Sequence, residues 1–319
     1  MSHEQDWSLA SAATIAAGVS SGSVSARDVV AAALARIHRV DPRVNSFTDI
    51  LAGRALDRAA ALDAALARGE APGPLSGVPF AVKNLFDVAG LPTRAGAAIN
   101  RDRAPATRDA LLIRRLEAAG AVLVGALNMG EYAYDFTGEN LHDGDTHNPH
   151  DRSRMSGGSS GGSGAAVAAG LVPLTLGSDT NGSIRVPAAF CGCFGLKPTY
   201  GRLSRAGSFP FVGSLDHLGP MGRSVADLAL AYDAMQGADP DDPVCTTRAP
   251  DPALPDLEAG IGGLRIAVAG GHFARAGEPE AFAAVARVAD ALGTTRVIEV
   301  PEAARARAAA YLITAAEGA

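Results

Sequence analysis

Residues 155–170 read MSGGSSGGSGAAVAAG, and residues 176–187 read LGSDTNGSIRVP. Glycine and serine at this density are typical of a flexible linker. Here, however, the run continues directly into residues 165–169, which have the composition of a buried helix, and then into the apolar, strand-like segment 172–176. Because a linker would not be joined to core elements on both sides, the stretch is predicted to be a functional loop built into the core.

A loop rich in backbone N–H groups at the start of a helix is a common anion-binding geometry. The phosphate-loop pattern GxxxxGK[ST] is absent, however, and no basic residue lies between Gly157 and Ala169. A dinucleotide fingerprint needs a strand just before it, whereas residues 148–154 form a polar segment. The GxSxG elbow is approached only loosely. The remaining hypothesis is a hydroxyl nucleophile beside amides that stabilise an oxyanion.

A serine nucleophile needs a general base, which is most often histidine. None of the seven histidines stands in an evident triad context. Lys83 is the alternative base, because it ends an apolar run at 79–83 that is predicted to be a buried strand. Desolvation there would disfavour the ammonium form and leave a lysine able to accept a proton near pH 7. From Lys83 alone, a lysine that extends from a strand end toward solvent is the stronger interpretation.

Four ordered blocks together resemble the amidase signature family of serine hydrolases. They are FAVKN at 80–84, GGSSGGSG at 157–164, GSDTNGSIR at 177–185 and GLKPT at 195–199. The resemblance begins near residue 8 and continues to the end of the chain. It implies a catalytic set in which Ser183 is the nucleophile, Ser159 is a bridging serine preceded by a cis peptide bond, and Lys83 is the base.

The mechanism implied by the resemblance is a proton relay. Neutral Lys83 accepts the proton of Ser159, which takes the proton of Ser183 as that serine attacks an amide carbonyl. The reverse path protonates the departing nitrogen. Many members carry Gly-Gly before the nucleophile, whereas this chain has Asn181, a residue that tolerates a left-handed backbone. The implied oxyanion hole consists of the backbone N–H groups of Thr180, Asn181, Gly182 and Ser183.

The same resemblance assigns roles outside the relay. Asp179 and Arg185 flank the nucleophile and are expected to support its loop rather than react.

His142, His147 and His150 match no zinc pattern, and loops of this composition are usually turns, so no metal and no other cofactor is expected. The residues expected on the substrate side are Met129, Tyr132, Phe136 and Asn140.

Within the family, residues 131–140, 179–183, 201–207 and 214–219 are most similar to enzymes that hydrolyse 1-carboxybiuret. This similarity implies that the chain cleaves a C–N amide bond of a small, polar urea derivative through an acyl-enzyme and releases ammonia. It also implies a small accessory subunit. The second candidate is the glutamine-hydrolysing A subunit of glutamyl-tRNA(Gln) amidotransferase, although Asn181 favours the first. An inactive scaffold or binding subunit is the candidate from another class.

The composition of the chain limits its domain number and its classes of binding partner. The chain has 319 residues, of which 47% are hydrophobic and 19% are charged, enough for one large or two ordinary domains. A net charge of −6 and the lack of a basic stripe argue against direct nucleic-acid binding. Because the sequence has no signal pattern and no apolar run of roughly 18 residues, a cytoplasmic protein without membrane attachment is expected. A homo-oligomer is compatible with all of this.

Alternating helices and strands predict an α/β layered fold. The resemblance implies a large mixed β-sheet covered by helices on both faces. Residues 1–319 are treated as one amidase-signature domain with a helical region at about 1–70, a catalytic core at about 71–237 and a C-terminal part from about 260. Relatives normally continue past the last residue, so that C-terminal part is predicted to be incomplete. Helices are predicted at 9–19, 29–40, 55–68, 111–119, 224–235 and 279–292, and strands at 78–82, 121–124, 172–176, 264–268 and 296–300.

Overall fold

The computed structural model describes residues 7–318, so the N-terminal segment in which no signal pattern was found lies largely outside the described residues. Contacts within the chain divide it into two compact units, with the boundary after Leu254. This boundary lies close to the expected start of the C-terminal part. A single domain over residues 1–319 remains a prediction, and the two units are described separately.

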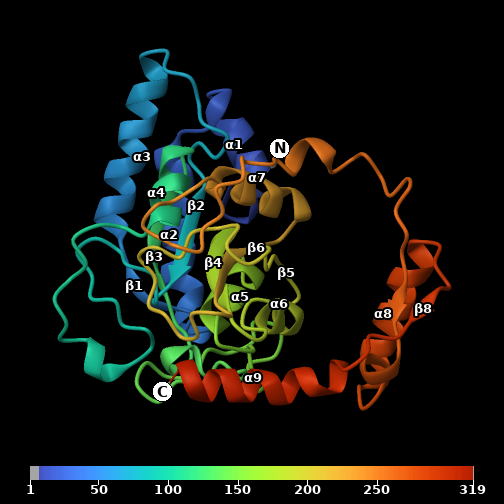
Figure 1. Ribbon diagram of the computed structural model, residues 1–319. Helices are drawn as coiled ribbons and strands as arrows, with labels where there is room; N and C mark the ends of the chain where they lie inside the picture. Colours follow the sequence, from blue (N-terminus) through green and yellow to red (C-terminus); the bar gives the residue numbers. More distant parts are fainter. Residues whose placement is uncertain (1–6, 319) are drawn as a thin grey trace. The chain divides into compact units, whose positions relative to one another are not determined.

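A six-stranded mixed β-sheet forms the centre of the first unit, as predicted (Figure 1). Its strands lie in the order β1-β3-β2-β4-β6-β5. Strand β2 runs parallel to both β3 and β4, whereas β1, β6 and β5 each run antiparallel to their neighbours. The carboxyl ends of the three central strands therefore lie at the same edge of the sheet. The strands are β1 (Phe47–Ile50), β2 (Pro79–Lys83), β3 (Val122–Leu127), β4 (Leu174–Asp179), β5 (Phe194–Gly195) and β6 (His217–Gly222).

Every residue of β2, β3 and β4 is buried, which explains why β2 and β3 are almost continuously apolar. Helices α3 and α4 pack against β3, and α5 packs against β4. Polar residues in these central strands, among them Lys83 and Ser178, therefore need partners inside the protein. The helices of this unit are α1 (Ala12–Ser20), α2 (Ala26–Val40), α3 (Ala52–Ala67), α4 (Leu111–Ala118), α5 (Gly161–Ala168), α6 (Arg185–Cys191) and α7 (Val225–Met235).

Helix α2 shows how the sequence specifies these elements. Its buried positions include Val30, Leu34 and Ile37, which recur at the three- and four-residue spacing of one helix face. Burial of each such side chain stabilises the fold by about 1.5–3 kcal/mol. At its start, the Ser25 hydroxyl accepts the N–H of Asp28 at 2.9 Å and caps the helix.

The glycine run was expected to be a loop that precedes a helix at 165–169, but α5 already begins at Gly161. Glycine costs a helix about 1 kcal/mol relative to alanine. Here close packing requires it, because a Cβ atom at Gly162 would lie 2.5 Å from the carbonyl oxygen of Asn128 and 2.6 Å from that of Ser46. The glycines therefore allow the first turn of α5 to contact two neighbouring backbone segments.

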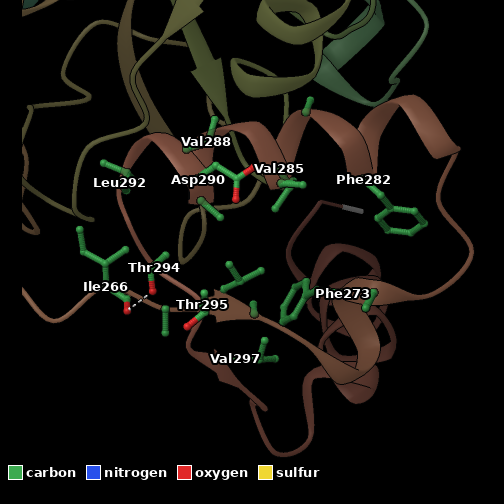
Figure 2. A pocket seen from close by; sticks show the side chains of 17 residues that line it. Ile266, Phe273, Phe282, Val285, Val288, Asp290, Leu292, Thr294, Thr295 and Val297 are labelled. Atoms are coloured by element: carbon green, nitrogen blue, oxygen red, sulfur yellow. Dashed lines mark hydrogen bonds between the residues drawn. The ribbon is translucent and has the colours of Figure 1, made fainter.

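The second unit contains a pair of parallel two-residue strands, β7 (Val268–Ala269) and β8 (Val297–Ile298), joined through helix α8 (Pro279–Ala291). The strands are shorter than predicted. Figure 2 shows Phe282, Val285 and Val288 of α8 beside a groove in which Thr294 Oγ1 donates a hydrogen bond to the carbonyl of Ile266 at 2.9 Å. Helix α9 (Ala303–Glu317) follows. The apolar side chains of α8 remain exposed, in contrast to those of the first unit.

Short 3₁₀ helices lie before or between these elements, at Trp7–Leu9, Asp41–Arg43, Ala98–Asn100, Glu131–Ala133, Leu254–Asp256 and Gly271–Ala274. Among the described helices, none combines the length and the apolar character that a membrane crossing requires.

Candidate active site

Three buried polar side chains meet at the carboxyl edge of the central sheet. Lys83 is the last residue of β2, Ser178 lies near the end of the neighbouring strand β4, and Ser159 comes two residues before α5. The Lys83 Nζ donates hydrogen bonds to Ser159 Oγ at 2.6 Å and to Ser178 Oγ at 2.9 Å. The structure thus brings Lys83 and Ser159 together, although they are 76 residues apart in the sequence.

Lys83 is 0% exposed, and this burial determines its protonation state. Desolvation lowers the pKa of Lys83 from 10.5 to about 7, while the carboxylates of Asp135, Asp216 and Asp179 act in the opposite direction. A lysine with a pKa near 7 carries a substantial neutral fraction at neutral pH. The amine can therefore serve as a proton acceptor, which an ordinary surface lysine cannot.

The backbone holds Ser159 in place. The peptide bond between Gly158 and Ser159 is cis, as the resemblance implied. The Ser159 carbonyl accepts the N–H of Gly130 at 3.1 Å, and the Ser160 N–H donates to the carbonyl of Ser183 at 3.3 Å. These bonds hold the Gly/Ser loop against the loop of the expected nucleophile. The hydrogen bonds found among residues 7–318 include none between the side chains of Ser159 and Ser183.

Ser183 occupies the tight turn between β4 and α6 and is 4% exposed. The carboxylate of Asp179 organises this turn, since it accepts the N–H groups of Gly182 at 2.8 Å and of Ile184 at 3.3 Å. Arg185 binds the same carboxylate through Nε and Nη2, each at 2.9 Å. Burial alone would raise the pKa of Asp179, but the bonds from Arg185 outweigh it and hold that pKa below its usual value. Asp179 therefore remains ionised and shapes the turn.

The expected oxyanion donors differ in availability. The N–H of Gly182 is already bound to Asp179. Within residues 7–318, by contrast, the N–H groups of Thr180, Asn181 and Ser183 have no hydrogen-bond partner. The positive φ of the turn, +141°, falls on Gly182. The tolerance of Asn181 for a left-handed backbone is not used here, because the glycine that follows it takes up the unusual backbone angle.

The four residues expected on the substrate side have unlike environments. Met129 is 1% exposed and belongs to the hydrophobic core. The amide of Asn140 donates to the carbonyls of Gly96 at 2.8 Å and Met129 at 2.7 Å, and its oxygen accepts the N–H of His142 at 2.8 Å. The contacts of Met129 and Asn140 in the structure are therefore with the core and with neighbouring loops.

Tyr132 and Phe136 remain predicted substrate contacts. Tyr132 is half-buried, and its ring centroid lies 5.6 Å from that of Phe209. Phe136 is 46% exposed. A Cβ atom placed on Gly182 would lie 3.4 Å from the Phe136 ring, so this ring stands beside the turn that holds Ser183.

The histidines of the segment before the Gly/Ser loop have separate partners. His142 Nε2 lies 3.1 Å from a carboxylate oxygen of Glu131, and His150 Nε2 lies 2.9 Å from the carbonyl of Cys191. In the part of the chain that the structure describes, no group of three or more His, Cys, Asp or Glu side chains is placed to hold a metal ion.

Sequence reasoning missed three polar residues near the site: Ser178, Asp135 and Asp216. Ser178 stands next to Asp179 in a motif that had been identified, so the period-two alternation of a strand could have indicated it. Asp135 and Asp216 have no comparable local signal. Their influence on Lys83 arises from the tertiary fold alone.

Comparison with known proteins places this arrangement in a family. The family model described as Amidase matches residues 28–319. The chain belongs to the amidase signature family. This membership confirms the predicted family and the α/β fold with its large mixed sheet.

Two curated relatives and one solved structure are similar to this amidase chain. AtzE of Pseudomonas sp. (strain ADP), which is described as a 1-carboxybiuret hydrolase subunit, is 58% identical over 301 residues, which cover 94% of this chain and 66% of AtzE. The A subunit of glutamyl-tRNA(Gln) amidotransferase from Anaeromyxobacter dehalogenans (strain 2CP-C) is 47% identical over 307 residues, covering 94% of this chain and 62% of that protein. The chain thus spans somewhat less than two thirds of the length of these relatives.

The solved structure is described as "An unexpected vestigial protein complex reveals the evolutionary origins of an s-triazine catabolic enzyme". It superposes with a TM-score of 0.96 at 57% sequence identity and covers 97% of this chain and 68% of that chain. An amidase chain of the same fold is thus known as part of a protein complex.

Proposed function

We propose that this chain carries the catalytic centre of an amidase that hydrolyses a C–N amide bond of a small, polar, urea-type substrate similar to 1-carboxybiuret. The observation that carries the proposal is the buried hydrogen bond of 2.6 Å between Lys83 and Ser159, beside the turn that presents Ser183. A lysine with a pKa of about 7 in this position can remove a proton from a serine.

The proposed reaction begins when Ser183 Oγ attacks the amide carbonyl carbon. Its proton passes to Ser159, whose own proton passes to neutral Lys83. The N–H groups of Thr180, Asn181 and Ser183 stabilise the oxyanion, and each such donor contributes about 3–4 kcal/mol in comparable hydrolases. The C–N bond then breaks, and the nitrogen leaves as ammonia after it takes up the proton from the relay. Water hydrolyses the resulting carbamoyl-enzyme by the same path, which releases a carbamic acid and restores the Ser183 hydroxyl.

The proposed substrate class rests on the relatives. Identity to the 1-carboxybiuret hydrolase relative is 58%, compared with 47% to the amidotransferase relative, and the former is described as acting on 1-carboxybiuret. We expect the purified chain to release ammonia from 1-carboxybiuret and not from glutamine, measured by a coupled ammonia assay. Release from glutamine alone would instead assign the chain to the amidotransferase group. Release from neither, without any modification of Ser183, would support the inactive scaffold.

The pH dependence of the reaction provides a second test. Since the base is neutral Lys83 with a pKa of about 7, kcat/KM is expected to rise tenfold per pH unit below about pH 7 and to level off above it. The measurement is kcat/KM for ammonia release across the neutral range. A rate that does not change through pH 7 would show that Lys83 is not the titrating base.

An accessory protein is part of the proposal as well. The relative from Pseudomonas is described as one subunit of an enzyme, and the similar solved structure is described as a protein complex. These descriptions support a partner protein for this chain. Copurification of a second polypeptide with the tagged chain from its native host would identify that partner.

A further inference from the structure

Asp135 has one carboxylate oxygen that is bound and one that is not. Its Oδ2 accepts the N–H groups of Thr137 at 3.0 Å and Gly138 at 2.6 Å, together with the Thr137 hydroxyl at 3.2 Å. Its Oδ1 is inaccessible to solvent and has no hydrogen-bond partner among the described residues. Because an unpartnered buried carboxylate oxygen is costly, it calls for a specific explanation, such as a functional role.

The carboxylate of Asp135 packs against the two glycines that hold Ser159. A Cβ atom at Gly158 would lie 2.7 Å from Oδ1 and 2.8 Å from Cγ, and one at Gly130 would collide with the same carboxylate. Gly158 precedes Ser159 through the cis peptide bond, and Gly130 donates its N–H to the Ser159 carbonyl. Both neighbours of Asp135 are therefore linked directly to the serine that contacts Lys83.

Three carboxylates act on Lys83, and two of them are fully engaged elsewhere. Asp179 is paired with Arg185 through both oxygens. Asp216 accepts the hydroxyl of Thr180 at 2.5 Å on one oxygen. On its other oxygen it accepts the backbone N–H groups of Phe211 at 2.8 Å and Val212 at 2.9 Å. Within the described part of the chain, Asp135 alone of the three retains an oxygen without a partner, and it opposes the fall in the pKa of Lys83 most strongly.

We propose that Asp135 is a positioning residue of the relay, whose carboxylate stabilises the Lys83 ammonium formed when the lysine takes up the proton of Ser159. This inference rests on the proposed function. Without Asp135, each turnover would place the Lys83 cation in a site closed to water, where the two remaining carboxylates are already bound to other groups. With Asp135 in place, the free carboxylate oxygen is held beside the relay before the proton arrives, so no rearrangement is needed.

The sharpest probe is Asp135→Asn. An asparagine has the same size and can still accept the N–H groups of Thr137 and Gly138 through its amide oxygen, but it carries no charge. The matched control is Thr137→Val, which removes the hydroxyl bonded to the same carboxylate and leaves the charge intact. Should the asparagine variant fail to fold, as judged by circular dichroism, Asp135→Ser removes the charge with a smaller side chain that also fits between the glycines.

The composition of the chain permits a direct measurement, because Lys83 and Lys197 are its only lysines. Lysine labelled with ¹³C at Cε gives two resonances, and Lys197 serves as the internal reference. We expect the titration midpoint of Lys83 to fall by about one pH unit in Asp135→Asn and to remain unchanged in Thr137→Val. A folded Asp135→Asn chain with an unchanged midpoint would overturn the inference and leave Asp135 a purely structural role.

A second readout separates this inference from the proposed function. The rate at which a fluorophosphonate modifies Ser183 should rise with pH as Lys83 loses its proton. In Asp135→Asn this rise should occur at a lower pH, shifted by the same amount as the titration midpoint of Lys83. If wild-type Ser183 is modified and this rise does not move, the inference fails alone. If the lysine midpoint moves as expected but wild-type Ser183 is never modified, the electrostatic link stands and the proposed function fails.

Discussion

Ser183→Ala is expected to abolish ammonia release and fluorophosphonate modification, with a loss of at least about 10⁴-fold in kcat/KM. The turn held by Asp179 presents the Ser183 hydroxyl next to three N–H groups that have no partner within residues 7–318. Alanine leaves that turn and its donors intact but removes the attacking oxygen. The loss therefore reports the chemical step and not the fold.

Intact-mass analysis after exposure to a fluorophosphonate measures this result. The wild-type chain should gain a single adduct as the Ser183 Oγ–P bond forms and fluoride leaves, and Ser183→Ala should gain none. Ser163→Ala is a suitable control, because the Ser163 hydroxyl is buried in α5 and donates only to the carbonyl of Leu176 at 3.0 Å. It should cost about 1 kcal/mol of stability and keep the adduct. An adduct that persists in Ser183→Ala would show that a different serine is the nucleophile.

Lys83→Met is expected to lower kcat/KM by roughly 10²–10⁴-fold, because the relay loses its terminal base. Methionine has a similar length and fills the same buried space without an amine. The Ser159 and Ser178 hydroxyls lose a shared partner, which costs some stability at every pH.

The same substitution should also change how stability depends on pH. The pKa of Lys83 is about 7 in the folded chain and near its ordinary value of 10.5 when unfolded. Because the folded-state pKa is depressed, unfolding takes up a proton between these values, and the wild type loses stability as pH falls from 10.5 to 7, with no further loss below. Lys83→Met lacks this dependence, so its stability relative to the wild type should increase as the pH falls over that interval.

Urea unfolding of both chains at a series of pH values tests the effect. Lys197→Met provides the comparison, because Lys197 is partly solvated and should contribute a shallower dependence. A stability difference between the wild type and Lys83→Met that is constant from pH 7 to 10.5 would contradict the depressed pKa.

The elements best predicted from the sequence are those with strong periodicity. Helix α2 and strand β2 agree with the predicted elements to within a few residues, because the buried face repeats and the apolar run is continuous. Strands β1 and β6 were missed because neither has an alternating apolar pattern. Strand β6 reads HLGPMG and is held in the sheet by its pairing with β4.

The candidate site was only partly predictable for a similar reason. Motifs give the identity and order of residues but not the direction of their side chains. The motifs therefore indicated Lys83 and Ser159 as partners. They also placed Met129 and Asn140 on the substrate side, whereas in the structure Met129 packs in the core and Asn140 supports a loop. The position of the Asp135 carboxylate depends on the close approach of two glycines. One of them is 23 positions away in the sequence, so no local pattern encodes the contact.

The residues of the relay and the aromatic residues Tyr132 and Phe136 come from different segments of the chain. This arrangement bears on how such an enzyme acquires new substrates. Lys83 ends a strand, and Ser159 and Ser183 lie in the loops before α5 and α6, whereas Tyr132 and Phe136 belong to a different stretch, which meets the Ser159 loop through Gly130 and Asp135. Substitutions at Tyr132 and Phe136 are expected to reshape the proposed substrate side of the site and to leave the turn that holds Ser183 unchanged. A laboratory evolution experiment should therefore randomise Tyr132 and Phe136 and hold Asp135 constant, because the Asp135 carboxylate is proposed to stabilise the Lys83 ammonium.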